Sequence, residues 1–213
     1  QAGESVSTGT LNTFVGSKAG VFCTTGANNT FVGEKAGLGI TGAKLTGSSN
    51  TAVGGEAGLE LQGAAGTNTL IGHQAGYKVT TGTENTAIGG IALGSSNGAS
   101  NQNTAIGRAS GFGVTTGDNN SFLGNDAGRG NSPSGNVTTA NNTICIGNDA
   151  VTACHVEVDW TVGSDQRDKT DFTALDLGLD FVKALAPVTY KWDKRSRYGD
   201  NTADDYDLNA QTP

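Results

Sequence analysis

A short pattern of polar and apolar positions recurs eight times along residues 12–151. Most copies resemble "NTFVGEKAG" at 29–37: Asn, Thr or Ser, a variable apolar residue, an aliphatic residue, Gly, and then a polar turn. The asparagines stand at 12, 29, 50, 68, 85, 103, 120 and 142, which gives steps of 17, 21, 18, 17, 18, 17 and 22 residues. The eighth copy, "NTICIGNDAV" at 142–151, carries one additional residue. A period near 17 with insertions only between motifs predicts a solenoid of about eight stacked coils.

The apolar positions of the motif predict a short strand in every coil, with two apolar faces. We expect the strictly aliphatic fourth position to point into the coil interior as the core of the repeat. It is occupied by Val15, Val32, Val53, Ile71, Ile88, Ile106, Leu123 and Ile146. The third position is more variable and faces the opposite side, because successive strand residues alternate. A second apolar face indicates contact with another chain.

The remaining motif positions predict tight corners. The Gly that follows the strand is expected to take a positive φ or to allow close backbone approach. Three residues later stands Ala in seven copies and Ser110 in the other, so this position is expected to be crowded. The Asn that opens each motif either caps a corner through its side chain or stacks from coil to coil as a ladder.

Composition supports an ordered β-structure and narrows the possible partners. The 213 residues include 34 Gly but only 3 Pro, which together with the regular spacing favours tight turns between short strands over disorder. The net charge of -7 disfavours nucleic acid as a partner. No apolar run has the length of a membrane span, and no signal peptide is visible. Because the chain begins at Gln1 and contains no Met, we interpret it as part of a longer product.

Little in the repeat predicts chemistry. Cys23, Cys145 and Cys154 are irregularly spaced and form no CxxC pair, and His155 has no partners at ligand spacing, so we predict no metal site and no cofactor. Acidic residues such as Glu34, Glu56 and Glu84 are scattered. The paired carboxylates of a glycan-degrading enzyme are therefore not expected, and no activity on an external substrate is predicted.

The pattern changes after the last coil and divides the chain into three segments. Residues 1–151 form the predicted β-solenoid, and the alternation around Val156, Val158 and Trp160 predicts a neck strand within 152–163. Residues 164–213 then combine helical spacing around "LGLDFVKAL", a strand "PVTYKW" and a polar tail. We interpret this last segment as the beginning of a small α+β domain.

Two resemblances to known families follow from these motifs. The repeat N-[TS]-x-[VIL]-G-x-x-A resembles the heads of trimeric bacterial adhesins and the shafts of phage tail fibres, which are parallel β-rolls or β-helices in homotrimers. The segment "SDQRDKTDF" with "LGLDFVKALAPVTYKW" resembles the start of the intramolecular chaperone domain of phage tail fibres and tailspikes, the peptidase S74 family. The matching residues are Ser164, Asp165, Arg167, Lys169, Phe172, Leu185, Pro187, Val188, Tyr190 and Trp192.

The second resemblance implies a specific chemistry at the boundary. Members of that family trimerise, nucleate folding of the upstream fibre and release themselves at a Ser-Asp junction, here Ser164–Asp165, with Ser164 and Lys169 as the catalytic pair. Lys169 can act as the base only if its pKa falls, and the neighbouring Asp168 opposes this. Attack by Ser164 on its own carbonyl needs a four-membered ring, and attack on the Gly163 carbonyl would cut one bond earlier. Cleavage at Ser164–Asp165 therefore requires another group or protomer.

These features predict a structural and adhesive protein. We expect a homotrimeric viral tail fibre segment that is assembled in the host cytoplasm, resides in the virion and binds a host cell-surface receptor or glycan. Its C-terminal chaperone promotes trimer folding, and at most one enzymatic event is expected, a single-turnover autoproteolysis. The alternatives are a cellular trimeric surface adhesin and, with less support, a polysaccharide-degrading tailspike. Neither nucleic-acid binding nor membrane insertion is expected.

Overall fold

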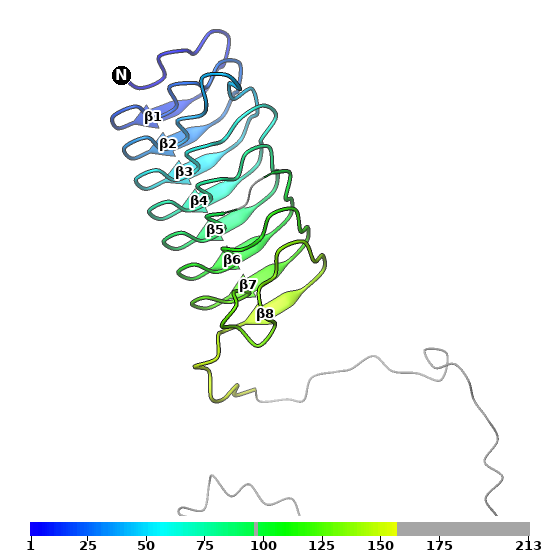
Figure 1. Ribbon diagram of the computed structural model, residues 1–213. Helices are drawn as coiled ribbons and strands as arrows, with labels where there is room; N and C mark the ends of the chain where they lie inside the picture. Colours follow the sequence, from blue (N-terminus) through cyan, green and yellow to red (C-terminus); the bar gives the residue numbers. More distant parts are fainter. Residues whose placement is uncertain (96–97, 157–213) are drawn as a thin grey trace, which may run out of the picture. The chain divides into compact units, whose positions relative to one another are not determined.

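The computed structural model describes residues 1–95 and 98–156, and these form a parallel β-solenoid (Figure 1). Each coil contributes one three-residue strand to a single eight-stranded sheet with the order β1 to β8. The strands are β1 (Thr13–Val15), β2 (Thr30–Val32), β3 (Thr51–Val53), β4 (Thr69–Ile71), β5 (Thr86–Ile88), β6 (Thr104–Ile106), β7 (Ser121–Leu123) and β8 (Ile144–Ile146). We number the coils by these strands. The predicted solenoid is confirmed.

All strand pairs are parallel and in the same register, so equivalent motif positions stack on one another. Thr13 pairs with Thr30, Phe14 with Phe31 and Val15 with Val32, and this pattern continues to β8. Because β7 pairs Ser121 with Ile144, the last motif begins at Thr143 and has no additional residue. The prediction that Asn142 opens the eighth motif is therefore wrong.

The two faces of the strands are the reverse of the sequence-based prediction. The third position points into the coil: Phe31, Ala52, Leu70, Ala87 and Ala105 are fully buried. The fourth position points outward, so the prediction that it forms the repeat core is wrong. Val32 and Val53 are half-buried. The other residues at this position are exposed: Ile71, Ile88, Ile106, Ile146, Leu123 and Val15.

The interior tolerates variation because neighbouring coils share its volume. Phe14 and Phe31 stack with ring centroids 5.2 Å apart. Ala87 in coil 5 is small, and in the same coil the buried Leu93 occupies a position that is Gly in most other coils, such as Gly76 in coil 4. A Cβ on Gly76 would lie 2.5 Å from the side chain of Leu70. Large and small residues are thus exchanged between two positions of one coil.

A ladder of buried asparagines runs through the coils. Asn29, Asn50, Asn68, Asn85, Asn103 and Asn120 are 0–1% exposed. Asn68 shows the repeating unit: its Nδ2 donates to Asn50 Oδ1 at 2.9 Å and to the Gly82 carbonyl at 2.8 Å. Its Oδ1 accepts from the backbone N–H and the Nδ2 of Asn85 at 3.0 and 3.1 Å. Both roles foreseen for this Asn, the ladder and the backbone cap, are therefore present, and the amide is fully satisfied.

Glycine at the end of each strand permits the close stacking of coils. Gly33 has a φ of +137°, and a Cβ placed on it would lie 2.5 Å from the carbonyl oxygen of Gly54 in the next coil. Both reasons expected for Gly, the positive φ and the close approach, therefore apply here. The Ala three residues later is buried in coils 1 to 5 and in coil 7, as at Ala19 and Ala127, which agrees with the expected crowding.

Two predictions concern segments at the margin of the described chain. Residues 152–156 form no strand, and the rest of the predicted neck, 157–163, lies outside the described residues. The predicted chaperone segment 164–213 also lies outside them.

Replacing Asn68 by Ala should lower the free energy of unfolding of the solenoid by about 3–5 kcal/mol, because it removes four buried hydrogen bonds and leaves partners on both neighbouring coils unpaired. Asn125→Ala is the matched control, because Asn125 is exposed and its side chain donates only to Asp126. The Asn125→Ala substitution should change the free energy of unfolding by no more than about 0.5 kcal/mol. Urea denaturation followed by circular dichroism measures both variants. Equal losses would contradict the role of the ladder.

Leu93→Gly should lower the free energy of unfolding by about 2–3 kcal/mol, because it empties the interior beside Ala87. Adding Ala87→Leu recreates the arrangement of coil 4, Leu70 with Gly76, and should restore most of the loss. The same denaturation experiment on the two single variants and the double variant measures their coupling. Strictly additive effects would show that the two positions do not share one volume.

Candidate functional site

The most extensive candidate feature on the surface of the solenoid is the exposed fourth position of the motif, which is the last residue of each strand. We call the set Val15, Val32, Val53, Ile71, Ile88, Ile106, Leu123 and Ile146 the aliphatic stripe. Equivalent positions stack in register along the sheet, which makes the stripe continuous from β1 to β8. Ile88 is 37% exposed and Leu123 is 53% exposed.

The second motif position, which is the first residue of each strand, lies on the same outward face, because residues two apart in a strand point to one side. It is Thr in β1 to β6 and Ser121 in β7. The sheet therefore presents a row of short hydroxyl side chains beside a row of aliphatic ones. No charged residue occurs within β1 to β8. Exposed sheet faces are ordinarily polar, and extended apolar rows mark interaction surfaces.

Charged side chains gather instead at the turns that follow the strands. In coils 2 to 4, Lys35 Nζ lies 3.0 Å from Glu56 Oε1, and Gln74 Nε2 donates to Glu56 Oε2 at 2.9 Å. The hydrogen bonds from Gln74 and Lys35 lower the pKa of Glu56. Glu56 therefore stays ionised at neutral pH and holds the Gln74 amide in a fixed orientation.

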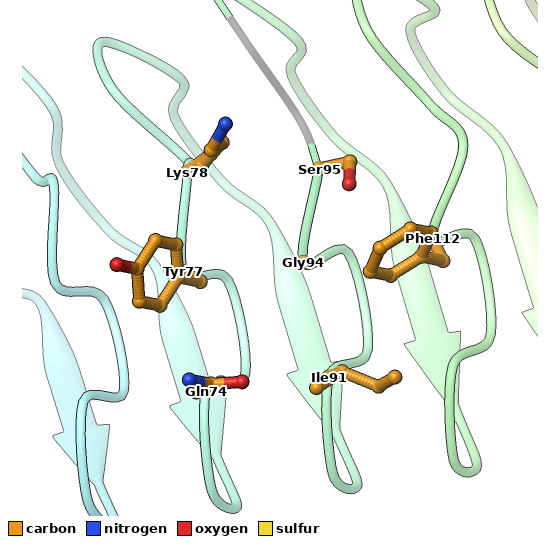
Figure 2. Close-up of a pocket in the computed structure, with 7 residues that line it drawn as sticks. All are labelled: Gln74, Tyr77, Lys78, Ile91, Gly94, Ser95 and Phe112. Carbon is orange, nitrogen blue, oxygen red and sulfur yellow. The ribbon is translucent and has the colours of Figure 1, made fainter.

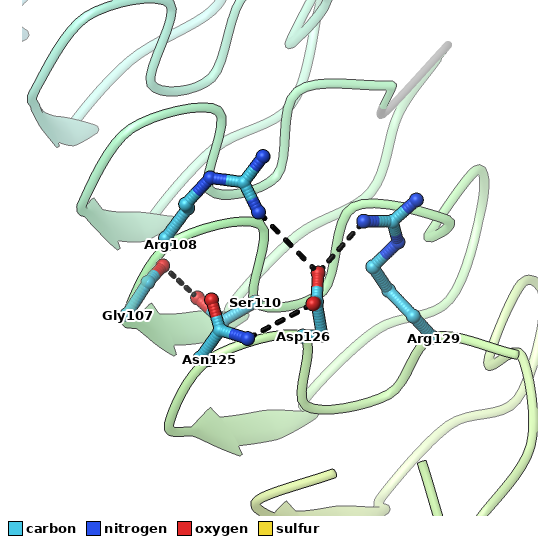
Figure 3. A network of polar contacts seen from close by, with 6 residues as sticks. All are labelled: Gly107, Arg108, Ser110, Asn125, Asp126 and Arg129. Atoms are coloured by element: carbon cyan, nitrogen blue, oxygen red, sulfur yellow. Dashed lines mark hydrogen bonds and ion pairs between the residues drawn. The ribbon is translucent and has the colours of Figure 1, made fainter. Parts of the chain in front are cut away.

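A second network occupies the turns of coils 6 and 7 (Figure 3). Asp126 Oδ1 accepts from Arg129 at 2.7 Å and lies 4.0 Å from Arg108. The hydrogen bond from Arg129 is the largest of the effects that lower the pKa of Asp126. The Arg129 guanidinium also lies over the ring of Phe112, 5.1 Å from its centroid. Asp126 thus anchors a cation that covers one aromatic ring on the surface.

The scattered carboxylates are used for structure. Glu56 binds Lys35 and Gln74, and Glu84 accepts from Gln102 Nε2 at 3.1 Å in the next coil. Within 1–95 and 98–156, no three His, Cys, Asp or Glu side chains are grouped as metal ligands would be. Burial raises the pKa of the Cys23 thiol, which keeps it protonated. No helix among the described residues has the length and apolarity needed to cross a membrane.

The insertions between motifs contribute buried side chains to the interior as well as exposed residues to the surface. The insertion of coil 2 carries Leu45, which is fully buried, and that of coil 7 carries Val137, which is 6% exposed. Each insertion therefore anchors one apolar side chain in the interior. Most of their polar residues are exposed or half-buried, but Ser132 in the insertion of coil 7 is only 7% exposed.

The predicted cleavage residues stand outside the described chain. Ser164, Asp165 and Lys169 all belong to 157–213, so their geometry stays a prediction.

Comparison with known families bears on this C-terminal segment. Residues 164–210 match the peptidase S74 family, the chaperone of endosialidase. The match begins at Ser164, the residue at which the sequence pattern changes. No curated protein and no solved structure matches the chain. The chain therefore joins a parallel β-solenoid to a segment similar to the chaperone of endosialidase.

Proposed function

We propose that the chain is the shaft and host-attachment segment of a homotrimeric viral tail fibre, followed by a chaperone that aligns three copies during folding. The observation that carries this proposal is the aliphatic stripe. Eight residues are all aliphatic although they point away from the coil interior, whereas the buried third position ranges from Ala to Phe. A partner surface accounts for an outward face that is uniformly apolar.

The partner that fits best is a second copy of the same chain. A stripe with one residue per coil has the same repeat distance on every copy, so parallel copies can match it coil by coil. The Thr row beside it adds small hydroxyl groups without charge, which allows sheet faces to approach closely. Closed symmetric assemblies are the common outcome of such self-association. The trimer is favoured by the similarity of 164–210 to the fibre chaperone family.

The repeat also explains why such a protein would need a chaperone. Because neighbouring coils are so alike, displacing one chain by a single coil, about 4.8 Å, preserves most contacts along the stripe. Register is weakly specified in such an interface. Long-range interchain pairing is also slow to nucleate. A trimerising domain that joins the three chains at one end would fix the register before the coils pack.

The chaperone match favours a viral fibre over a cellular adhesin with an anchoring domain. A polysaccharide-degrading tailspike has less support, because Glu56 and Glu84 bind neighbouring coils. We therefore place release of the chaperone, by a single cut at Ser164–Asp165, as the only chemistry in the function.

Ile71→Asp should reduce assembly of the 213-residue chain, because it places a charge in the centre of the stripe. Wild-type protein is expected to sediment at three times the mass of its 21.4 kDa chain, or of its processed chain if cleavage occurs. The variant should shift toward the monomer. Sedimentation velocity measures the distribution.

Thr81→Asp serves as the matched control for this experiment. Thr81 is exposed in the same coil but lies in a turn outside the strands, so the same added charge should leave the trimer intact. A monomeric wild-type chain, or an Ile71→Asp variant that assembles as well as the control, would contradict the proposed interface.

Lys169→Ala should prevent self-cleavage, because it removes the proposed base. Wild-type protein should yield fragments 1–164 and 165–213 by intact mass spectrometry, whereas the variant should stay whole. Lys183→Ala removes another lysine from the same segment and should still be cut. If wild type stays whole under all conditions, the release mechanism is wrong, although the assembly role is unaffected.

A further inference from the structure

Coil 5 differs from the other coils five residues after the Gly that ends its strand, and a pocket opens at this position. In coils 1 to 4, 6 and 7 this residue is large: Val21, Leu38, Leu59, Tyr77, Phe112 and Arg129. In most coils it follows Gly, but coil 5 reverses the order and has Leu93 followed by Gly94. Leu93 is buried in the interior, and Gly94 leaves a gap in the surface row. The same exchange therefore fills the interior and opens the surface.

The gap is bounded by two aromatic rings (Figure 2). Tyr77 of coil 4 and Phe112 of coil 6 flank Gly94, and Ile91 lies toward the turn. The pocket has a volume of about 210 Å³. Coils two apart are separated by about 9.6 Å at the usual strand spacing. A saturated six-membered ring in van der Waals contact on both sides requires about 7–8 Å.

The Phe112 wall of the pocket is held in place by contacts already described. A Cβ on Gly94 would lie 3.1 Å from Cδ2 and Cε2 of Phe112, so this ring narrows the gap toward coil 5. The Arg129 guanidinium covers the same ring. Figure 3 shows the contact with Asp126 that holds Arg129. A site whose walls are already in place loses little entropy on binding.

Polar groups stand at the edge of the pocket. The Gln74 amide nitrogen is bound to Glu56, and Figure 2 shows its oxygen on the side of Ile91. The Ser95 hydroxyl and the Lys78 ammonium complete the polar lining. Among the described residues, Lys78 is the one charged residue that lines the pocket, and no carboxylate lines it.

We propose that this pocket binds one pyranose unit of a surface polysaccharide, and that Lys78 favours a unit that carries a carboxylate. A pyranose has apolar C–H faces and a rim of hydroxyl groups, which matches two aromatic walls with polar groups at the edge. Gln74 Oε1 accepts a hydrogen bond from a sugar hydroxyl. Ser95 either donates to or accepts from another, and the Lys78 ammonium pairs with the sugar carboxylate.

The inference rests on the attachment role proposed above, but the site itself is independent of assembly. All seven lining residues belong to one chain, and none belongs to the aliphatic stripe or to any strand. The monomeric Ile71→Asp variant should therefore still bind saccharide. Loss of the trimer and loss of the sugar site can thus be observed separately.

The experiment applies the 213-residue chain to an array of acidic and neutral oligosaccharides, and then measures the best retained probe by calorimetry. Wild-type protein should retain carboxylate-bearing sugars in preference to neutral ones. Tyr77→Ala should weaken the binding about tenfold or more, because it removes one wall. Lys78→Gln should weaken binding of the acidic probe and leave that of its neutral counterpart unchanged.

Leu59→Ala is the matched control, because Leu59 holds the same position in coil 3 but does not line the pocket. It should bind like wild type. The site is overturned if wild type retains no saccharide, or if Tyr77→Ala and Leu59→Ala bind equally well. The role of Lys78 is overturned if acidic and neutral probes bind with the same affinity.

Discussion

The buried Asn ladder is the interaction on which the solenoid depends. Each strand is only three residues long, and coils pair across 17 to 23 residues of chain, so the strands alone specify the stacking poorly. The Asn amide joins three successive coils at a position with no water. A slip of one residue would leave its donors and acceptors unpaired in the interior, which costs far more than each bond gains. The ladder therefore fixes the register inside one chain, and the Gly after each strand lets the coils approach closely enough to form it.

The ladder settles register within a chain but leaves register between chains open. An outward face that repeats in every coil is good for a long continuous interface and poor for specifying which coil meets which. Buried amides align the coils, and we propose that the C-terminal segment similar to the chaperone of endosialidase aligns the chains. The change of sequence character at Ser164, where the family match begins, marks the boundary between the solenoid and that segment.

Much of the fold could be predicted from the sequence because the period, the Gly and the Asn are strict. The orientation of the strands could not, because a strictly aliphatic position is compatible both with a buried core and with an outward face that a partner covers. Two positions of one coil can exchange a large and a small residue, so Ala87 is compensated by Leu93 of the same coil, and the buried position varies. The outward position has no such neighbour to compensate it and is uniform. The eighth register was missed because Thr143 replaces Asn, and the backbone hydrogen bond from Thr143 to Asn120 Oδ1 maintains the stacking.

The sequence indicates the turn conformations and the pocket less clearly than it indicates the repeat. Residues such as Lys35 and Glu56 adopt positive φ values of 55° and 58°, although their types disfavour it, because the coil geometry repeats at every turn. The pocket did have a signal, the reversed order of Leu93 and Gly94, but its meaning depends on knowing which position faces outward.

The central claim, that the aliphatic stripe is covered by other copies of the chain, can be tested by solvent access to isoleucine methyl groups. Ile71, Ile88 and Ile106 are 38%, 37% and 41% exposed in the single chain, and Ile40, which lies off the stripe, is 36% exposed. In an assembled sample with a soluble paramagnetic probe, the methyl signals of these three stripe residues should be protected, while the methyl signal of Ile40 is attenuated. Equal attenuation of all four would contradict the account.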